Sequence, residues 1–335
     1  MPQPLFSILT TAYRTEDYVA QTIESVLAQT FDDWELIVVD NGNSDEMADI
    51  VDKYTGDSRV TLVRQANSGV RGGVAAAADV AVGRYLCLLD SDDMLEPNFC
   101  ERIAAVIEAD PEVQAVGCDA ELFTDFDVLP PERYFHSVGR TTVPDTLSLS
   151  DMLDEGVPPY IGAVRRDVWA AHAMYDPRGA DVEPDVEMWL SLAAGRRNIR
   201  LLGDCLARIR LRPDSMTHEP SAVEGYESRL ARAFISVGEQ LELSDAEATE
   251  YPALQRIRYH QALRRARWAV LEGDVASARI AAREAYRQRA TLRAAAVIIG
   301  LHISPRLLRS VHPAKNRVEI ALRRIRYRLA SGHTR

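Results

Sequence analysis

Short apolar runs alternate with amphipathic stretches along the first 220 residues of the chain. Residues 5–11, 34–39, 60–63, 85–89 and 115–123 have the length and apolar composition of buried strands. Between these runs, residues 16–29, 46–54, 69–82 and 99–109 carry apolar side chains at helical spacing or pack small residues. This strand–helix alternation predicts an α/β fold, with a parallel sheet covered by helices.

The pattern changes after residue 123. Proline, aspartate and aromatic residues accumulate between residues 124 and 157, which predicts an irregular excursion. Strands are expected at 158–165 and 199–211, and helices at 166–173 and 185–194. From residue 222 onward the pattern is helical, with breaks near Gly273, 300–305 and Pro313. We therefore expect two domains, 1–220 and 221–335.

The composition of the chain is that of an ordinary globular protein. Of the 335 residues, 47% are hydrophobic and 27% are charged, which is typical of a soluble protein with a sizeable core. The N-terminus shows no basic leader of a signal peptide, and no apolar run reaches the roughly 18 residues that a membrane span needs. The four cysteines are scattered without metal-ligand spacing. These features predict a cytoplasmic protein.

Charge divides the chain more sharply than composition does. The net charge is −11, yet residues 251–335 hold 19 Lys and Arg against 4 Asp and Glu. A basic helical region next to an acidic domain suggests an anionic partner, such as the inner face of a membrane or a nucleic acid. The alternative is a helical appendage whose arginines are solvated or pair with the acidic domain.

One stretch points to chemistry. The apolar run 85–89 is followed at once by Asp90, Asp92 and Asp93. Open α/β sheets bind ligands beyond the carboxyl ends of their strands, and closely spaced carboxylates suit a hard cation such as Mg²⁺ or Mn²⁺. Such a cation would bridge the phosphates of a substrate. Taken alone, the same residues also fit a solvated acidic turn.

Four stretches, in order, carry a resemblance to a known family. They are SILTTAYRTEDYVAQTIESVLAQTFDDWELIVVDNGNSD, NSGVRGGVAAAADVAVGRYLCLLDSDDMLEP, DVEPDVEMWLSLAAG and RLRPDSMTH. Over roughly the first 220 residues the chain resembles the family 2 glycosyltransferases of the GT-A fold. The resemblance implies a mainly parallel, Rossmann-like sheet flanked by helices. It also implies a nucleotide-diphosphate sugar donor, a divalent metal and transfer with inversion.

The resemblance assigns the donor side of the site. Thr11 and Tyr13 would lie near the base and ribose, and Asp40 and Asn41 would follow the strand whose loop hydrogen-bonds the nucleobase. Many relatives carry a second Asp at the position of Asn41. We therefore expect Asp40 to matter more for structure and Asn41 for the choice of base.

The resemblance assigns a second set of residues to the acidic motif and to the phosphates of the donor. Asp90 would face the ribose hydroxyls, Asp92 would hold the metal and Asp93 would assist it. Arg212 stands where a His is common in the family, and an arginine there would contact the diphosphate. His218 is then the substitute candidate for a metal ligand.

Asp185 is the expected general base, because an inverting transfer needs a carboxylate to take the proton of the acceptor hydroxyl. Pro184 suits the first turn of a helix and leaves Asp185 at its N-terminal end. Relatives often carry an Arg-Asn pair where this chain has Val74 and Ala75, and Arg71 is the candidate that replaces the lost positive charge near the nucleotide.

Together these features predict a metal-dependent, inverting glycosyltransferase that acts in cell-surface polysaccharide or glycolipid assembly. Its partners would be a nucleotide sugar, a glycan or lipid-linked acceptor and an anionic membrane surface. A GT-A module that has lost catalysis and binds nucleotide or a partner is the first alternative. A sugar nucleotidylyltransferase is the second, although TTAYRTEDY lacks the glycine-rich loop that this class needs. A nucleic-acid ligand finds no aromatic-basic recognition motif.

Overall fold

The computed structural model describes residues 3–125, 132–137, 140, 143–155, 159, 161–172, 175–179, 181–212, 220–241, 251–306 and 308. The chain divides into two compact units. The first holds Met1–Phe123, Pro131–Met152 and Val157–Leu211, and the second holds Thr124–Pro130, Leu153–Gly156 and Arg212–Arg335. Among the described helices, none combines the length and the hydropathy that a bilayer crossing requires.

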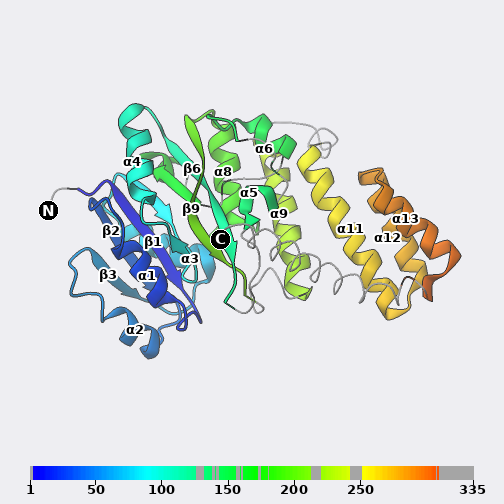
Figure 1. Ribbon diagram of the computed structural model, residues 1–335, viewed down its shortest axis with the longest axis horizontal. Helices are drawn as coiled ribbons and strands as arrows, with labels where there is room; N and C mark the ends of the chain where they lie inside the picture. The colour runs from blue at the N-terminus through cyan, green and yellow to red at the C-terminus, as the bar shows by residue number, and fades with distance from the viewer. Residues whose placement is uncertain are drawn as a thin grey trace, which may run out of the picture. The chain divides into compact units, whose positions relative to one another are not determined.

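The first unit is built on one mixed sheet, whose strands run in the order β3-β2-β1-β4-β8-β6-β9-β5, with β7 paired to β6. Figure 1 labels β1, β2, β3, β6 and β9 of this sheet. The strands are β1 (Phe6–Ala12), β2 (Trp34–Asp40), β3 (Val60–Arg64), β4 (Tyr85–Leu88), β5 (Met94–Leu95), β6 (Ala115–Phe123), β7 (Glu132–Arg133), β8 (Ile161–Arg165) and β9 (Ile199–Arg210).

The first four long strands form the parallel half of the sheet. β1 pairs in parallel with β2 and β4, and β2 pairs in parallel with β3. The register sets Ala12 beside Asp40, so the loops after β1, β2 and β4 leave the same edge. The polar residues that follow these three strands therefore lie at the same edge of the sheet.

The other half of the sheet differs from the parallel arrangement that the sequence predicts. β8 runs antiparallel to both β4 and β6, whereas β6 and β9 are parallel. Residues 124–160, rather than a single crossover helix, lead from β6 to β8, so nothing forces these two strands into the same direction. The expected irregular excursion also contains β7 and two short helices, α5 (Tyr134–Ser137) and α6 (Leu149–Glu155).

Helices cover both faces of the parallel half. α1 (Val19–Leu27), α2 (Asp45–Val51) and α4 (Phe99–Ala109) share one core cluster with alternate residues of β1 and β2, among them Phe6, Ile8, Leu36 and Val38. The crossover through α3 (Gly69–Val80) runs back across β1 to β4, and right-handed connections therefore place α3 on the opposite face. α7 (Arg166–Ala171) packs on β8 and β4, and Trp189 of α8 (Pro184–Ala194) lies against Gly162 of β8.

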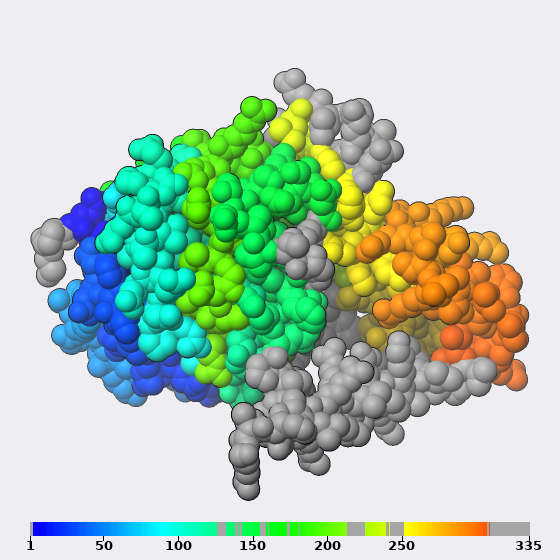
Figure 2. All heavy atoms as spheres, turned by 45° about the horizontal axis from the view of Figure 1, so that its top comes forward, coloured from blue at the N-terminus to red at the C-terminus, as the bar shows by residue number. Residues whose placement is uncertain are grey.

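The described part of the second unit is helical and contains α9 (Pro220–Gln240), α11 (Pro252–Glu272), α12 (Val275–Gln288) and α13 (Leu292–Ile303). Gly273 ends α11 with a φ of 90°, as the sequence predicts, and Asp274 then caps α12. Buried alanines allow α11, α12 and α13 to pack closely, and their atoms run from yellow to orange in Figure 2. The break expected near Pro313 lies outside the described residues.

Candidate functional site

The three aspartates that follow β4 lie together. One ligand atom from each of Asp90, Asp92 and Asp93 can be chosen so that all lie within 4.8 Å of one another. Asp90 is exposed, Asp92 is half-buried and Asp93 is buried. The backbone N–H of Asp93 donates to the carbonyl of Asp90 at 3.0 Å, which tightens the turn. This set of oxygen donors fits a hard divalent cation.

Arg210, at the end of β9, holds this acidic loop in place. Its backbone N–H donates to Asp93 Oδ1 at 2.7 Å, and its Nε donates to the carbonyl oxygen of Asp92 at 2.8 Å. Its Nη2 donates to Gln21 Oε1 at 2.8 Å, and the guanidinium lies over the Tyr18 ring at 4.9 Å. Arg210 is 4% exposed. The charge of this arginine therefore sits behind the carboxylates as part of their framework.

Two further hydrogen bonds join the acidic loop to the segment after β1. The hydroxyls of Thr15 and Ser91 lie 2.8 Å apart, and Thr22 Oγ1 donates to the Asp93 carbonyl at 2.8 Å. All three side chains are buried. The loop after β1, the start of α1 and the acidic loop are thus held as one rigid edge.

A small cavity of about 270 Å³ lies where β1 and β2 end. Tyr13 is 43% exposed at this place, and the guanidinium of Arg14 lies 5.2 Å from its ring centroid. Thr11 Oγ1 is buried and has no hydrogen-bond partner among the described residues. The cavity is lined by Ala12, Tyr13, Arg14, Glu16, Asp40, Gly42, Ser44 and Met47. Tyr13 is therefore available to a ligand as an aromatic surface.

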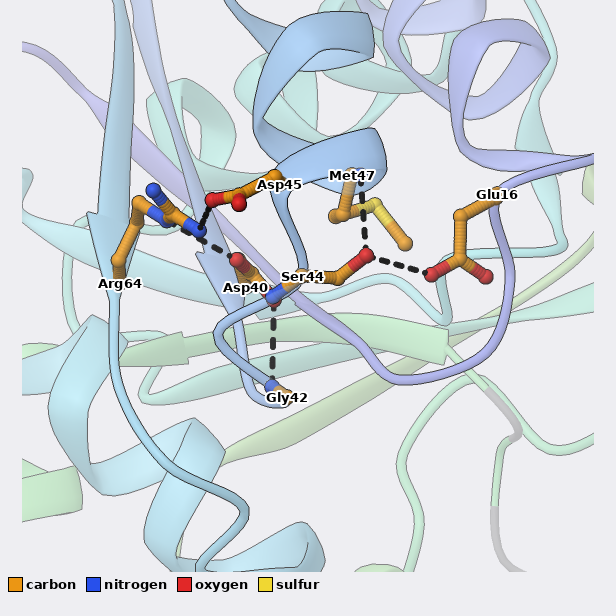
Figure 3. A network of polar contacts seen from close by, with 7 residues as sticks. All are labelled: Glu16, Asp40, Gly42, Ser44, Asp45, Met47 and Arg64. Atoms are coloured by element: carbon orange, nitrogen blue, oxygen red, sulfur yellow. Dashed lines mark hydrogen bonds and ion pairs between the residues drawn. The ribbon is translucent and has the colours of Figure 1, made fainter.

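Asp40 is bound to its own loop. Its Oδ1 accepts from the backbone N–H groups of Gly42 at 3.2 Å and Ser44 at 3.1 Å, and its Oδ2 accepts from Arg64 Nε at 3.2 Å. Figure 3 shows Arg64 reaching Asp40 and Asp45 together. Ser44 is the N-cap of α2, because its Oγ accepts from Met47 N at 3.2 Å. These contacts give the Asp40 carboxylate a structural role.

Asn41 fastens the start of α3 to the end of β2. Its Oδ1 accepts from Gln65 Nε2 at 2.8 Å and from Ser68 N at 3.2 Å, and its Nδ2 donates to the Gly69 carbonyl at 3.0 Å. Asn41 is 2% exposed. These bonds use the carbonyl oxygen of the Asn41 amide and one of its two N–H donors, and the expected choice of base by Asn41 stays a prediction.

Asp185 lies in the first turn of α8, directly after Pro184 at the N-terminal position. The hydroxyl of Tyr175 donates to Asp185 Oδ1. The pKa of Asp185 is raised from 3.8 to about 7, mainly by burial and also by the charge of Asp90, whereas the charge of Arg71 acts to lower it. The structure therefore brings Asp185 within electrostatic reach of the acidic loop, although 95 residues separate Asp185 from Asp90 along the chain. A carboxyl with this pKa is suited to general acid–base work near neutral pH.

Arg71 forms an ion pair with the same helix. Its Nη2 lies 2.5 Å from Glu187 Oε2, and the two side chains are 15% and 24% exposed. A Cβ atom on Gly179 would come within 3.0 Å of Arg71 Nη1, so the turn that contains Gly179 packs closely on this arginine. The structure thus sets Arg71 beside the expected base, and a contact with the nucleotide stays a prediction.

Two other expected site residues remain predictions. Arg212 lies two residues beyond the end of β9 and falls within the second unit. His218 lies outside the described residues.

Comparison with known proteins decides the family. Residues 7–144 match the profile of "Glycosyl transferase family 2", a range that includes β1, β2, β4 and the acidic loop. Residues 7–144 of this chain thus form a glycosyltransferase family 2 domain. The match confirms the family and the enzyme class that the sequence motifs predict.

Two curated relatives come from Bacillus subtilis strain 168. A protein of Bacillus subtilis strain 168 named as the teichuronic acid biosynthesis glycosyltransferase TuaG is 28% identical over 223 residues, which cover 64% of this chain and 82% of TuaG. The glycosyltransferase named EpsH, from the same strain, is 35% identical over 104 residues, which cover 31% of this chain and 30% of EpsH. The similarity to EpsH thus spans less than a third of either protein.

Solved structures support the GT-A fold class. S. aureus TarS 1-349 in complex with UDP-GlcNAc superposes with a TM-score of 0.60 at 18% identity, over 92% of each chain. The mannosyltransferase PcManGT from Pyrobaculum calidifontis, in complex with GDP-Man and Mn²⁺, gives a TM-score of 0.58 at 15% identity, over 92% of this chain and 84% of that one. At these identities the likeness shows the fold, and the predicted fold class is confirmed.

Sequence reasoning missed three residues at the site of this glycosyltransferase. Arg210 is the last residue of β9, but the same strand also contains Arg200, Asp204 and Arg208, so its charge did not single it out in the sequence. Thr15 and Tyr175 carried no signal, because their partners lie 76 and 10 residues away and only the fold brings them into contact.

Proposed function

We propose that this chain transfers a sugar from a nucleotide-diphosphate donor to an acceptor hydroxyl with inversion, in the assembly of a cell-surface polysaccharide or glycolipid. The observation that carries the proposal is the pairing of an acidic cluster at the end of β4 with Asp185. The cluster offers oxygen ligands within 4.8 Å of one another, and the charge of Asp90 raises the pKa of Asp185. The relative named for teichuronic acid biosynthesis supports the substrate class.

Asp185 acts as the general base. The acceptor oxygen attacks the anomeric carbon, its proton passes to the Asp185 carboxylate, and the bond from the anomeric carbon to the phosphate oxygen breaks. The electron pair of that bond leaves with the nucleoside diphosphate. Tyr175 donates to Oδ1, which leaves Oδ2 for the acceptor hydroxyl. Arg71 and Glu187 fix the first turn of α8, on which Asp185 lies.

Asp92 and Asp93 hold a divalent cation, Mg²⁺ or Mn²⁺, and Asp90 faces the ribose of the donor. When bound, the cation supplies positive charge that stabilises the leaving diphosphate. The fit rests on the donor set, which consists of carboxylates alone and lacks soft ligands. Arg212 is proposed to contact the diphosphate, and His218 to add a ligand.

Tyr13 and Thr11 form the base and ribose side of the donor site. Tyr13 offers an exposed ring beside the 270 Å³ cavity, and Thr11 Oγ1 is a buried hydroxyl without a protein partner among the described residues. Asp40 shapes this cavity by holding its loop.

The test is binding of a panel of nucleoside diphosphates by calorimetry, with and without Mn²⁺. The wild type should bind one nucleotide in a metal-dependent manner, and Asp92→Ala should lose that binding. Asp204→Ala is the matched control, because Asp204 is an exposed carboxylate that pairs with Arg102 on the surface of the same unit. Metal-independent or absent binding by the folded wild type would favour the alternative, a GT-A module without catalysis.

The helical region is proposed to contact the inner, anionic face of a membrane. Leu292, Ile299 and Ile303 are 92%, 57% and 79% exposed, and their spacing sets them on one side of α13. Arginines crowd the same unit, since Arg293, Arg256, Arg264 and Arg289 add to burial in lowering the pKa of His260. A unit that carries both exposed apolar side chains and many arginines suits a lipid surface with negative headgroups.

Co-sedimentation with vesicles tests this contact. The full chain should bind vesicles that contain phosphatidylglycerol and should not bind pure phosphatidylcholine. Replacing Ile299 and Ile303 by Ser should weaken binding, whereas replacing Ile280, which is exposed on α12, should change it less. Equal binding to both kinds of vesicle would refute an electrostatic contact.

A further inference from the structure

A groove of about 1050 Å³ opens on the α3 face of the first unit. Its walls are the second half of α3, the paired ends of β4 and β8, α7, and the turn at residues 175–178. This groove is larger than the cavity at the ends of β1 and β2, and none of the residues that line it belongs to the donor site described above. Its chemistry therefore needs an explanation of its own.

Positive charge gathers at the strand edge of the groove. Four arginines and three aspartates line it, and Arg165 and Arg178 are neutralised by Asp167 and Asp176. Arg84 and Arg166 are exposed and have no carboxylate partner in the described part of the chain. A backbone hydrogen bond of 2.9 Å from Arg166 N to the Arg84 carbonyl keeps the two residues adjacent.

The geometry of Arg166 shows that its charge is held at the groove. Its Nη1 donates to the Ala81 carbonyl at the C-terminal end of α3, at 3.2 Å. Two arginines without a carboxylate partner, on residues joined by a backbone hydrogen bond, favour the binding of an anion at this edge. Guanidinium groups bind phosphate and carboxylate through paired hydrogen bonds, so an anion of this kind is the fitting ligand.

At its other end the groove is linked to the proposed base through Tyr175, and Asp185 is not itself a lining residue. The ring of Tyr175 lines the groove, and its hydroxyl donates to Asp185. Tyr175 stacks on Trp169, with ring centroids 5.4 Å apart and an interplanar angle of 4°. The helix α3 rises by about 15 Å from Arg71, which lies near Asp185, to Ala81. A short oligosaccharide spans a similar length.

We propose that this groove binds the acceptor, and that the acceptor carries a phosphate or carboxylate group that Arg84 and Arg166 recognise. The inference rests on the proposed sugar transfer, for which it names the acceptor class. The acceptor chain lies along α3, its anionic group contacts the two arginines, and its reacting hydroxyl lies at the Tyr175 end beside Asp185.

Glucose 6-phosphate and glucose are the probes, because they differ by one phosphate group. Binding is measured by ligand-observed NMR in the absence of metal. The wild type should bind glucose 6-phosphate more tightly than glucose. The double variant Arg84→Gln/Arg166→Gln should weaken that binding by roughly tenfold or more, because each arginine supplies a charged hydrogen bond. Arg102→Gln is the matched control, since Arg102 is an exposed arginine of the same unit that lies outside the groove.

Two further readouts separate this inference from the proposed function. Both variants should bind the donor nucleotide with Mn²⁺ as the wild type does, since neither arginine lines the donor cavity. Glucose 6-phosphate should inhibit sugar transfer by the wild type in competition with the acceptor and not with the donor. Equal binding of the two probes, equal binding by variant and wild type, or competition with the donor would overturn the inference. If the wild type binds no donor nucleotide at all, the proposed function is refuted instead.

Discussion

The raised pKa of Asp185 has a measurable cost to stability. Burial and the charge of Asp90 raise it from 3.8 to about 7. Between about pH 4 and pH 7 the folded protein therefore holds a proton that the unfolded chain has lost, and the stability contributed by this group falls as pH rises through that window. A rise of about 3 in the pKa lowers the free energy of unfolding by at most about 4 kcal/mol. This loss is complete by pH 8.

Asp185→Asn should remove this cost. Asparagine is neutral at every pH, and its Oδ1 still accepts the hydrogen bond from Tyr175. At pH 8 the free energy of unfolding of the variant should exceed that of the wild type by up to about 4 kcal/mol, or roughly 10 °C in the unfolding midpoint. At pH 4 the two proteins should be alike, because the wild-type carboxyl is then neutral in the folded state.

The assay is thermal unfolding of both proteins at pH 4, 6 and 8, followed by circular dichroism. EDTA is present, because a cation held by Asp92 and Asp93 would offset the nearby charge of Asp90 that raises the pKa of Asp185. Sugar transfer by the variant should fall by roughly 10²- to 10⁴-fold, as expected for a lost general base, while nucleotide binding persists. A midpoint difference that does not change with pH, or a variant less stable than the wild type at pH 8, would refute the reasoning.

Three other substitutions test the surroundings of the acidic loop and the base. Tyr175→Phe removes a donor to the ionised carboxylate, so the pH at half-maximal transfer should rise by about one unit; an unchanged pH profile would contradict this. Arg71→Gln removes the cation that lowers the pKa of Asp185 and should move the pH profile of sugar transfer in the same direction, and calorimetry of this variant tests the predicted contact of Arg71 with the nucleotide. Arg210→Met removes the hydrogen bond to the Asp92 carbonyl. This change should lower the free energy of unfolding by about 2 kcal/mol and weaken Mn²⁺ binding. Equal Mn²⁺ affinity in variant and wild type would show that the loop keeps its shape without the guanidinium.

The sequence by itself determined the parallel half of the fold and the family. The apolar runs correspond to β1, β2, β3, β4 and β6, and α4 begins and ends at the predicted residues. Buried parallel strands and the helices between them leave strong local patterns, because each is apolar over its whole length or along one face. The acidic loop was predictable for the same reason, since Asp90, Asp92 and Asp93 are neighbours in sequence and at the end of a strand.

The tertiary structure decided everything that depends on residues far apart in the chain. The antiparallel direction of β8, the hydrogen bonds of Arg210 behind Asp93, and the approach of Asp185 to Asp90 leave no local pattern. The pKa of Asp185 depends on burial and on a charge 95 residues away, and burial is a property of the packed molecule. The identity of the candidate base could thus be predicted from its motif. Its pKa could be determined only from the surroundings that the fold provides.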